Sequence, residues 1–199
     1  ANPNNPTGTW FDDAALAAFL EKVPRNVLVV ADEAYHEYVD APGLTTALGF
    51  TGRHPNLVVT RTFSKAYGMA GVRVGYLVAH PDVVAVLERL RESFNVNSVA
   101  LAGATAALAD KPWLAKARAF NRAEREWLRE ELLERGYRCL PSQTNFLLCV
   151  LPHDASKLEN HLFERGVVVR PMGGYGLPRT LRISVGSRAE NRRLLKALP

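Results

Sequence analysis

Short apolar runs alternate with amphipathic segments along the first part of the chain. The predicted helices cover residues 12–22 and 81–91, and the predicted strands cover residues 27–31, 57–60 and 74–79. Continuous apolar runs of four to six residues are typical of strands that are covered on both faces. A proline at residue 81 suits the first turn of a helix. This alternation predicts an α/β fold of three layers with a mostly parallel sheet.

The pattern changes after about residue 111. A long amphipathic helix is predicted over residues 113–134 and is followed by shorter elements. Strands are predicted at residues 137–140, 145–150, 167–170 and 181–185, with a helix at residues 155–164. Ser187 and Glu190 match a capping box for a final helix. We therefore expect a domain over residues 1–112 and a smaller α+β domain over residues 113–199.

Composition describes an ordinary protein without a membrane segment. Hydrophobic residues make up 47% and charged residues 23% of the 199 residues. The longest uncharged stretch, residues 93–109, is too short and too polar to span a bilayer. The five histidines are scattered, so no metal site is expected. Cys139 and Cys149 lack a CxxC spacing, which favours reduced thiols and a cytoplasmic protein.

The net charge of +5 raises the question of a nucleic-acid partner. Along residues 113–134, however, the basic side chains are interleaved with acidic ones: Arg118, Arg122, Arg125 and Arg129 with Glu124, Glu126, Glu130 and Glu131. This mixture is typical of a solvated helix face with i,i+4 pairs. We expect no nucleic acid and no membrane as partners, and small anions as the more natural ligands of the excess charge.

Lys65 lies in an unusual setting, the segment Thr-Phe-Ser-Lys-Ala-Tyr-Gly-Met-Ala-Gly-Val-Arg of residues 62–73. A hydroxyl precedes the amine, glycines follow it, and Arg73 comes eight residues later. Asp32 ends one predicted strand and Lys65 follows the next, so both are expected at the carboxyl edge of the sheet, where α/β folds bind ligands. A lysine, a carboxylate and an arginine suit pyridoxal phosphate, although each alone has an ordinary structural explanation.

Four motifs in this order resemble the fold-type I, aspartate-aminotransferase-like superfamily of pyridoxal-phosphate enzymes. They are Asn-Pro-Asn-Asn-Pro-Thr-Gly at residues 2–8, Asp-Glu-Ala-Tyr at 32–35, Ser-Lys at 64–65 and Leu-Arg-Ile-Ser-Val-Gly at 181–186. Within that superfamily the chain is most similar to histidinol-phosphate aminotransferases. The resemblance covers the later half of such an enzyme, so residues 1–112 are expected to be the C-terminal part of its large cofactor-binding domain.

The resemblance implies a role for each residue around the cofactor. Lys65 is similar to the lysine that forms the Schiff base and then moves a proton at the substrate α-carbon. Asp32 matches the acid that pairs with the pyridine nitrogen. Asn5 and Tyr35 match two donors to the phenolate oxygen, which would keep the imine reactive near neutral pH. The remaining matches are cofactor-phosphate contacts: Ser64, Arg73 and Thr62.

The resemblance also implies where the substrate binds. Arg182 matches the arginine that holds the α-carboxylate, although an arginine in a strand could instead form a structural ion pair. Asn145 is a further candidate near that group. Arg170 is a candidate for the substrate phosphate or, alternatively, a solvent-facing strand end. Tyr175 lies in a glycine-rich segment that could border the site or be a surface loop.

The leading interpretation is amino transfer between histidinol phosphate and 2-oxoglutarate in histidine biosynthesis. An aromatic amino-acid aminotransferase, a phosphothreonine-type decarboxylase and the non-enzymatic effector domain of a transcription regulator remain alternatives. Such enzymes are homodimers that use further residues from an earlier half. The first residues, Ala-Asn-Pro-Asn, include no initiator methionine. From the resemblance we expect the full-length protein to be a homodimer. We expect these 199 residues alone to be inactive, because residues of the earlier half are missing from them.

Overall fold

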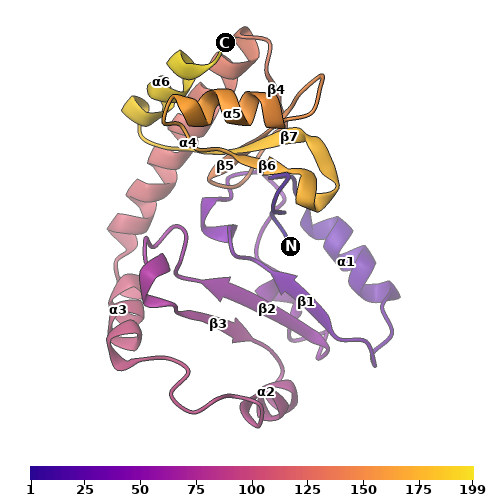
Figure 1. The fold of residues 1–199 in the computed structure, drawn as a ribbon. Coiled ribbons are helices and arrows are strands. Elements are labelled where there is room, and N and C mark those ends of the chain that lie inside the picture. The colour runs from indigo at the N-terminus through magenta and orange to yellow at the C-terminus, as the bar shows by residue number, and fades with distance from the viewer. The chain divides into compact units, whose positions relative to one another are not determined.

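The computed structural model describes residues 1–199 as two compact units. Unit 1 comprises residues 1–3 and 11–117, and unit 2 comprises residues 4–10 and 118–199. Each unit has its own sheet, labelled in Figure 1. The division falls inside the long helix α4, Lys111–Glu134.

Unit 1 contains a three-stranded sheet in the order β1-β2-β3. Its strands are β1 (Val29–Asp32), β2 (Leu57–Thr62) and β3 (Gly75–Val78), and its helices are α1 (Asp13–Lys22), α2 (Pro81–Glu88) and α3 (Ser98–Ala109), with 3-10 helices at η1 (His36–Tyr38), η2 (Ala47–Phe50) and η3 (Ala70–Val72). Leu16 and Leu20 of α1 pack with Leu57 and Val59 of β2 in one core. This core holds the carboxyl ends of β1 and β2 in a fixed register, in which Asp32 lies opposite Thr60.

The expectation of a mostly parallel sheet is wrong for the strands of this chain. β1 and β2 are parallel, whereas β3 runs antiparallel to β2. The link from β2 to β3 contains only the 3-10 helix η3, so it returns along the neighbouring strand without the crossover helix that a parallel pair needs. Full coverage of both sheet faces is not observed either, since Val30 is 55% exposed.

Helix α3, Ser98–Ala109, was not predicted from the sequence, which shows there only an uncharged stretch. The signal was present, because Asn97 caps the helix by accepting a hydrogen bond from the Ala100 N–H, at 2.8 Å. Ala100 and Ala104 pack with Phe63 and Val74 on either side of the loop that carries Lys65. This contact anchors both ends of that loop.

Unit 2 is built on a four-stranded antiparallel sheet in the order β4-β5-β7-β6. Its strands are β4 (Arg138–Cys139), β5 (Phe146–Val150), β6 (Arg170–Met172) and β7 (Leu177–Ser184), and its helices are α5 (Ser156–Glu164) and α6 (Arg188–Ala197) together with most of α4 and the 3-10 helix η4 (Gly173–Tyr175). Leu128 and Leu132 of α4 pack with Leu147, Ile183 and Leu194 in its core. The capping box of Ser187 and Glu190 at the start of α6 is confirmed.

The strand predicted at residues 167–170 lies elsewhere, because β6 begins at Arg170. The Val167 N–H donates to the Leu162 carbonyl at 2.9 Å, after Gly166 has turned the chain in the left-handed region at φ 69°. The backbone of Val167 therefore forms a hydrogen bond that ends α5. The side chains of Val167 and Val169 pack against the core. Apolar character at these positions reflects that packing.

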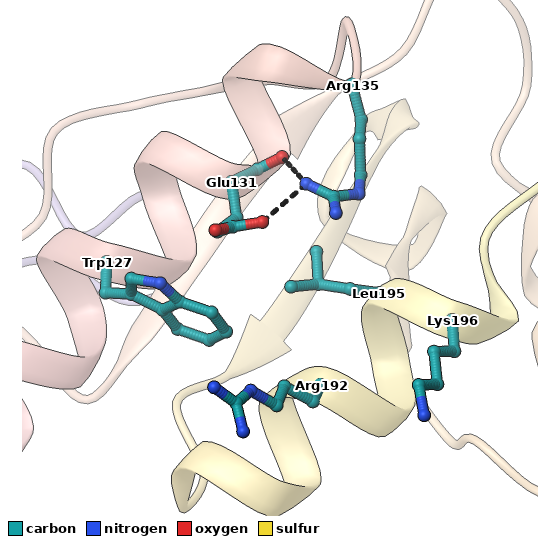
Figure 2. Close-up of a pocket in the computed structure, with 6 residues that line it drawn as sticks. All are labelled: Trp127, Glu131, Arg135, Arg192, Leu195 and Lys196. Carbon is teal, nitrogen blue, oxygen red and sulfur yellow. Dashed lines mark hydrogen bonds and ion pairs between the residues drawn. The ribbon is translucent and has the colours of Figure 1, made fainter.

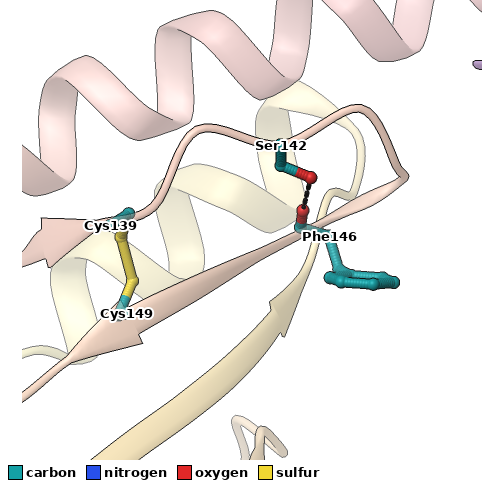
Figure 3. Close-up of a disulfide and its surroundings, with 4 residues drawn as sticks. All are labelled: Cys139, Ser142, Phe146 and Cys149. Carbon is teal, nitrogen blue, oxygen red and sulfur yellow. Dashed lines mark hydrogen bonds between the residues drawn. A yellow bond between two sulfur atoms is a disulfide. The ribbon is translucent and has the colours of Figure 1, made fainter. Parts of the chain in front are cut away.

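The two cysteines form a disulfide, in contrast to the reduced thiols expected from their spacing. Cys139 of β4 and Cys149 of β5 are directly opposed in the antiparallel ladder, with Cα atoms 4.0 Å apart (Figure 3). Strand pairing brings together residues ten apart in sequence, which a search for CxxC could not reveal. None of the helices is both long and apolar enough to cross a bilayer.

Candidate cofactor site

Unit 1 contains a pocket of about 400 Å³ at the ends of β1 and β2. Five residues singled out from the sequence line it: Asp32, Thr62, Ser64, Lys65 and Arg73. The parallel pairing of β1 and β2 explains this convergence, since the carboxyl ends of parallel strands open at the same edge of a sheet. The expectation that Asp32 and Lys65 face one crevice therefore agrees with the geometry.

The carboxylate of Asp32 keeps most of its bonding capacity for a ligand. Its Oδ1 accepts a hydrogen bond from the Ala34 N–H at 3.0 Å, which is the turn role that a lone aspartate would have. The residue is exposed at the end of β1 and forms no ion pair in the chain. A carboxylate with one oxygen free can accept a bond from a protonated ring nitrogen.

The amine of Lys65 lies beside an aromatic ring. Its Nζ atom is 5.3 Å from the ring centroid of Tyr35, a side chain that is only 7% exposed. No carboxylate of the chain forms an ion pair with Lys65. The residue is partly buried and no acid engages its amine, so the amine is available for covalent attachment to an aldehyde.

Arg73 adopts a backbone conformation that is rare for a residue with a side chain. It ends η3 in the left-handed region, at φ 57° and ψ 58°, which costs about 1–2 kcal/mol. Its Nη1 donates to the Ala70 carbonyl at 2.7 Å, and its other guanidinium N–H groups remain open. Strain of this kind concentrates at ligand-binding positions. With the hydroxyls of Thr62 and Ser64 in the same pocket, Arg73 provides a binding surface for a phosphate.

Sequence reasoning missed the ionic cluster beneath this pocket. Arg61 of β2 bonds Glu33 and Glu37, and all three side chains are at most 8% exposed. Burial raises the pKa of Glu37, and burial also raises the pKa of Tyr38 to about 12. A charged residue inside the apolar run Leu-Val-Val-Thr-Arg-Thr was the available signal, because a buried arginine requires buried acids.

Unit 2 holds the other sequence-predicted residues. Arg182 of β7 donates from Nη1 to the Asn5 Oδ1 at 2.6 Å, and its guanidinium carbon lies 5.1 Å from the centroid of the Phe146 ring. Asn5 thus uses its carbonyl oxygen in the chain and keeps its amide N–H₂ for a ligand. The backbone carbonyl of Asn145 accepts a hydrogen bond from the Val185 N–H. The Asn145 side chain does not bond Arg182.

Arg170 and Arg182 are direct cross-strand partners on β6 and β7. Opposed residues of an antiparallel pair project from the same face of the sheet, with Cβ atoms about 4.5–5.5 Å apart. Neither arginine forms an ion pair with an acid of the chain, and Arg170 is exposed. Two arginines at opposed positions of one ladder, neither paired with a carboxylate, suit an anionic ligand. Tyr175 is 53% exposed in η4.

A second pocket of about 340 Å³ lies between α4 and α6 of unit 2 (Figure 2). It is lined by Trp127, Glu131, Arg135, Arg192, Leu195 and Lys196, none of which the sequence analysis selected. Arg135 is already bonded to the side chain and the carbonyl of Glu131. The pocket is an open groove on the helical surface, and it contains none of the residues considered above.

These features define an α/β protein with a lysine-containing pocket whose polar groups suit a phosphorylated ligand. The chain belongs to the class I and II aminotransferase family, which matches residues 1–198.

Within this family, the curated relatives at about 50% identity are histidinol-phosphate aminotransferases. The enzyme of Anaeromyxobacter sp. (strain Fw109-5) is 51% identical over 199 residues, which are 100% of this chain and 55% of that protein. A crystal structure of the Sinorhizobium meliloti enzyme in complex with pyridoxal-5'-phosphate has a TM-score of 0.92 at 34% identity, and the match covers 100% of this chain and 55% of that one. The chain thus spans about half the length of the curated relatives it matches.

Other activities share this fold. L-threonine-O-3-phosphate decarboxylase from Porphyromonas gingivalis matches with a TM-score of 0.83 at 25% identity, over 98% of this chain and 61% of that one. Backbone similarity alone therefore does not separate transamination from decarboxylation, and the higher sequence identity favours the aminotransferases.

Proposed function

We propose that the whole protein is a pyridoxal-phosphate-dependent histidinol-phosphate aminotransferase. It would transfer an amino group between histidinol phosphate and 2-oxoglutarate in histidine biosynthesis. The observation that carries the proposal is the pocket of unit 1, which combines the Lys65 amine, the Asp32 carboxylate and the open guanidinium of Arg73. The 51% identity to a histidinol-phosphate aminotransferase supports the choice of substrate.

The residues of the pocket fit pyridoxal phosphate, which when bound supplies a ring that accepts electrons from the substrate α-carbon. Lys65 holds the cofactor covalently and, once released, moves a proton at that carbon. Asp32 keeps a proton on the pyridine nitrogen. Arg73, Ser64 and Thr62 bind the cofactor phosphate.

The polar groups of Asn5 and Tyr35 have a different role. By the family resemblance, each would donate a hydrogen bond to the phenolate oxygen of the cofactor, Asn5 through the amide N–H₂ that Arg182 leaves free. Stabilising the negative charge of that oxygen keeps the bound cofactor reactive near neutral pH.

Arg182 and Arg170 bind the anionic groups of the substrates. Arg182 receives the carboxylate of glutamate or 2-oxoglutarate, and the fixed fork of its guanidinium orients the reacting carbon. Arg170, which faces Arg182 across the ladder, adds a second positive charge for the phosphate of histidinol phosphate. Asn145, which precedes β5, is proposed to border the same anions.

The remaining expectations also belong to this proposal. Residues 1–112 would be the C-terminal part of a large, three-layered cofactor domain, and residues 113–199 a small C-terminal domain. The whole protein would act in the cytoplasm as a homodimer on small-molecule amino acids and oxo acids.

Absorption spectroscopy of the whole protein tests the role of Lys65. Wild-type protein with pyridoxal phosphate should show the band of the covalently bound cofactor, and Lys65→Ala should show only the spectrum of free or loosely bound cofactor. Lys157→Ala, which removes an exposed lysine of α5, should retain the wild-type band. A wild-type band in Lys65→Ala would refute the assignment.

Assays with defined substrates separate the related activities. Glutamate with imidazole-acetol phosphate should give turnover, whereas phosphothreonine should release no carbon dioxide. Turnover with phenylpyruvate but none with imidazole-acetol phosphate would indicate an aromatic aminotransferase instead.

A further inference from the structure

Arg61, which lines the pocket of unit 1, is the centre of a buried cluster of charges. Its Nε donates to Glu33 Oε2 at 2.8 Å, and its Nη1 donates to Glu37 Oε1 at 2.8 Å. Its Nη2 lies 2.7 Å from Glu33 Oε2 and donates to Thr46 Oγ1 at 2.9 Å. All three guanidinium nitrogens are therefore used, and the side chains of Arg61, Glu33 and Glu37 are 8%, 4% and 5% exposed.

The charges of such a cluster are a weak source of stability. Desolvating three ionisable groups costs several kcal/mol per ion, and well-packed apolar residues of the same volume are often equally stable or more so. The hydrogen bonding of the cluster is also incomplete, because Glu37 Oε2 is buried without a partner. Burial raises the pKa of Glu37.

The cluster joins the two segments that carry the residues of the cofactor site. Glu33 follows Asp32 directly, and Glu37 comes two residues after Tyr35. Arg61 lies in β2, one residue before Thr62, and itself lines the pocket. The guanidinium of Arg61 thus bonds the first and the last residue of the segment 33–37. These bonds connect that segment to β2, the strand that leads to Lys65.

Backbone pairing alone does not fix this segment. The ladder between β1 and β2 ends at Asp32 and Thr60, and the bond from the Glu33 N–H to the Thr60 carbonyl, at 3.0 Å, is the last one beyond it. After that point the chain turns into the short helix η1, and the Tyr35 ring faces Lys65 Nζ. Side-chain bonds to Arg61 therefore supply the positional restraint that the sheet no longer gives.

We propose that Arg61 is a positioning residue, which holds Asp32 and Tyr35 in register with Lys65 through Glu33 and Glu37. The inference rests on the proposed function, because it assigns these residues to pyridoxal phosphate. Arg61 does not bind the cofactor phosphate, since its donors are directed to the two carboxylates and Thr46. Its effect is on the orientation of the bound cofactor.

The test compares Arg61→Lys with Arg122→Lys in the whole protein. Lysine keeps the charge of Arg61 but lacks the planar fork, so it cannot hold Glu33 and Glu37 together. We expect kcat to fall by about 10- to 100-fold, the order of magnitude of small misplacements, with KM for glutamate within about threefold. The visible circular dichroism per bound cofactor should also fall. Arg122→Lys changes an exposed i,i+4 pair with Glu126 and should change neither quantity.

Two further variants keep the test decisive if Arg61→Lys does not fold. Glu37→Asp keeps the charge but shortens the side chain that reaches Arg61. It should lower kcat and the cofactor dichroism by about threefold or more. Glu37→Gln keeps the length and the hydrogen bond from Arg61, so its values should be close to wild type. Unchanged kcat and dichroism in folded Arg61→Lys or in Glu37→Asp would overturn the inference. A wild-type protein without a bound-cofactor band would instead contradict the proposed function itself.

Discussion

Gly8 shows how a single position can depend on the absence of a side chain. Its φ is +74°, and a Cβ atom built there would overlap the Oγ and Cβ atoms of Ser142. The Gly8 carbonyl also accepts a hydrogen bond from the Gln143 N–H at 3.0 Å. The turn that contains Asn5 is therefore packed directly onto the segment before β5, within unit 2.

Gly8→Ala should destabilise the protein for both reasons. The left-handed conformation alone costs an alanine about 1–2 kcal/mol, and the overlap with Ser142 adds to that cost. Gly174→Ala provides the control, because its Cβ would meet no atom within 4 Å and its φ is not positive. Urea unfolding of the two variants measures the difference. Equal stabilities would show that the turn shifts freely away from Ser142.

At the scale of elements, most of the helices follow the sequence pattern and most of the strand ends do not. Helix α6 begins where Ser187 and Glu190 predicted, because a capping box satisfies local backbone groups. β6 begins three residues later than predicted, because tertiary packing takes Val167 and Val169 into the core without strand pairing. Helix ends are encoded locally, whereas strand ends depend on a partner strand.

Helix α6 is also tied to α4 by a charged contact. Glu124 of α4 accepts hydrogen bonds from the Arg188 Nε at 3.0 Å and from the Asn191 Nδ2 at 3.0 Å. The hydrogen bond from Arg188 is the main cause that lowers the pKa of Glu124 below 4.5, against the opposing effect of burial. The contact therefore stabilises the folded state while Glu124 is ionised.

Glu124→Gln should lower the free energy of unfolding at pH 7 by about 1.5–3 kcal/mol, the range for hydrogen bonds to charged groups. Because the folded pKa is lowered, the stabilisation is fully present above the unfolded pKa, near 4.5, and is lost as the pH falls through the folded pKa. The difference between variant and wild type should therefore shrink below about pH 4.5. Glu126→Gln, in an exposed pair with Arg122, should have little effect at either pH. A pH-independent difference would contradict the assignment.

At the scale of the whole molecule, some arginines pair with acidic side chains and others do not. The net charge of +5 is not concentrated on α4, where Arg122 and Arg135 pair with Glu126 and Glu131. The arginines without acidic partners include Arg170 and Arg182, which face each other on one sheet. Like charges directly opposite are destabilising, so a ligand that neutralises them would explain their retention.

Arg170→Gln in the whole protein should separate the two substrates. We expect KM for histidinol phosphate to rise by about tenfold or more, since a charged hydrogen bond contributes about 1.5–3 kcal/mol, while KM for glutamate changes little. Thermal stability should not fall, because the repulsion with Arg182 is relieved. Arg138→Gln, an exposed arginine on β4 of the same sheet, is the control for steady-state kinetics. Equal changes in KM for both substrates would exclude a specific contact with the phosphate.

Sequence alone identified the family, most of the helices and the candidate residues for a cofactor site. It did so because motifs such as Ser64-Lys65 and the alternation of apolar runs are local properties of the chain. It could not identify the pairing of Cys139 with Cys149 or the antiparallel course of β3, which depend on how distant segments meet.

The sequence by itself thus singled out the lysine, the aspartate and the arginine that line one pocket of unit 1, together with the chemistry they allow. Tertiary structure decided which groups surround them: the Arg61 cluster beneath the pocket and the opposition of Arg170 and Arg182. The physical reason is that a residue type fixes charge and reactivity, while distance, burial and partners arise only when separate strands are brought into register.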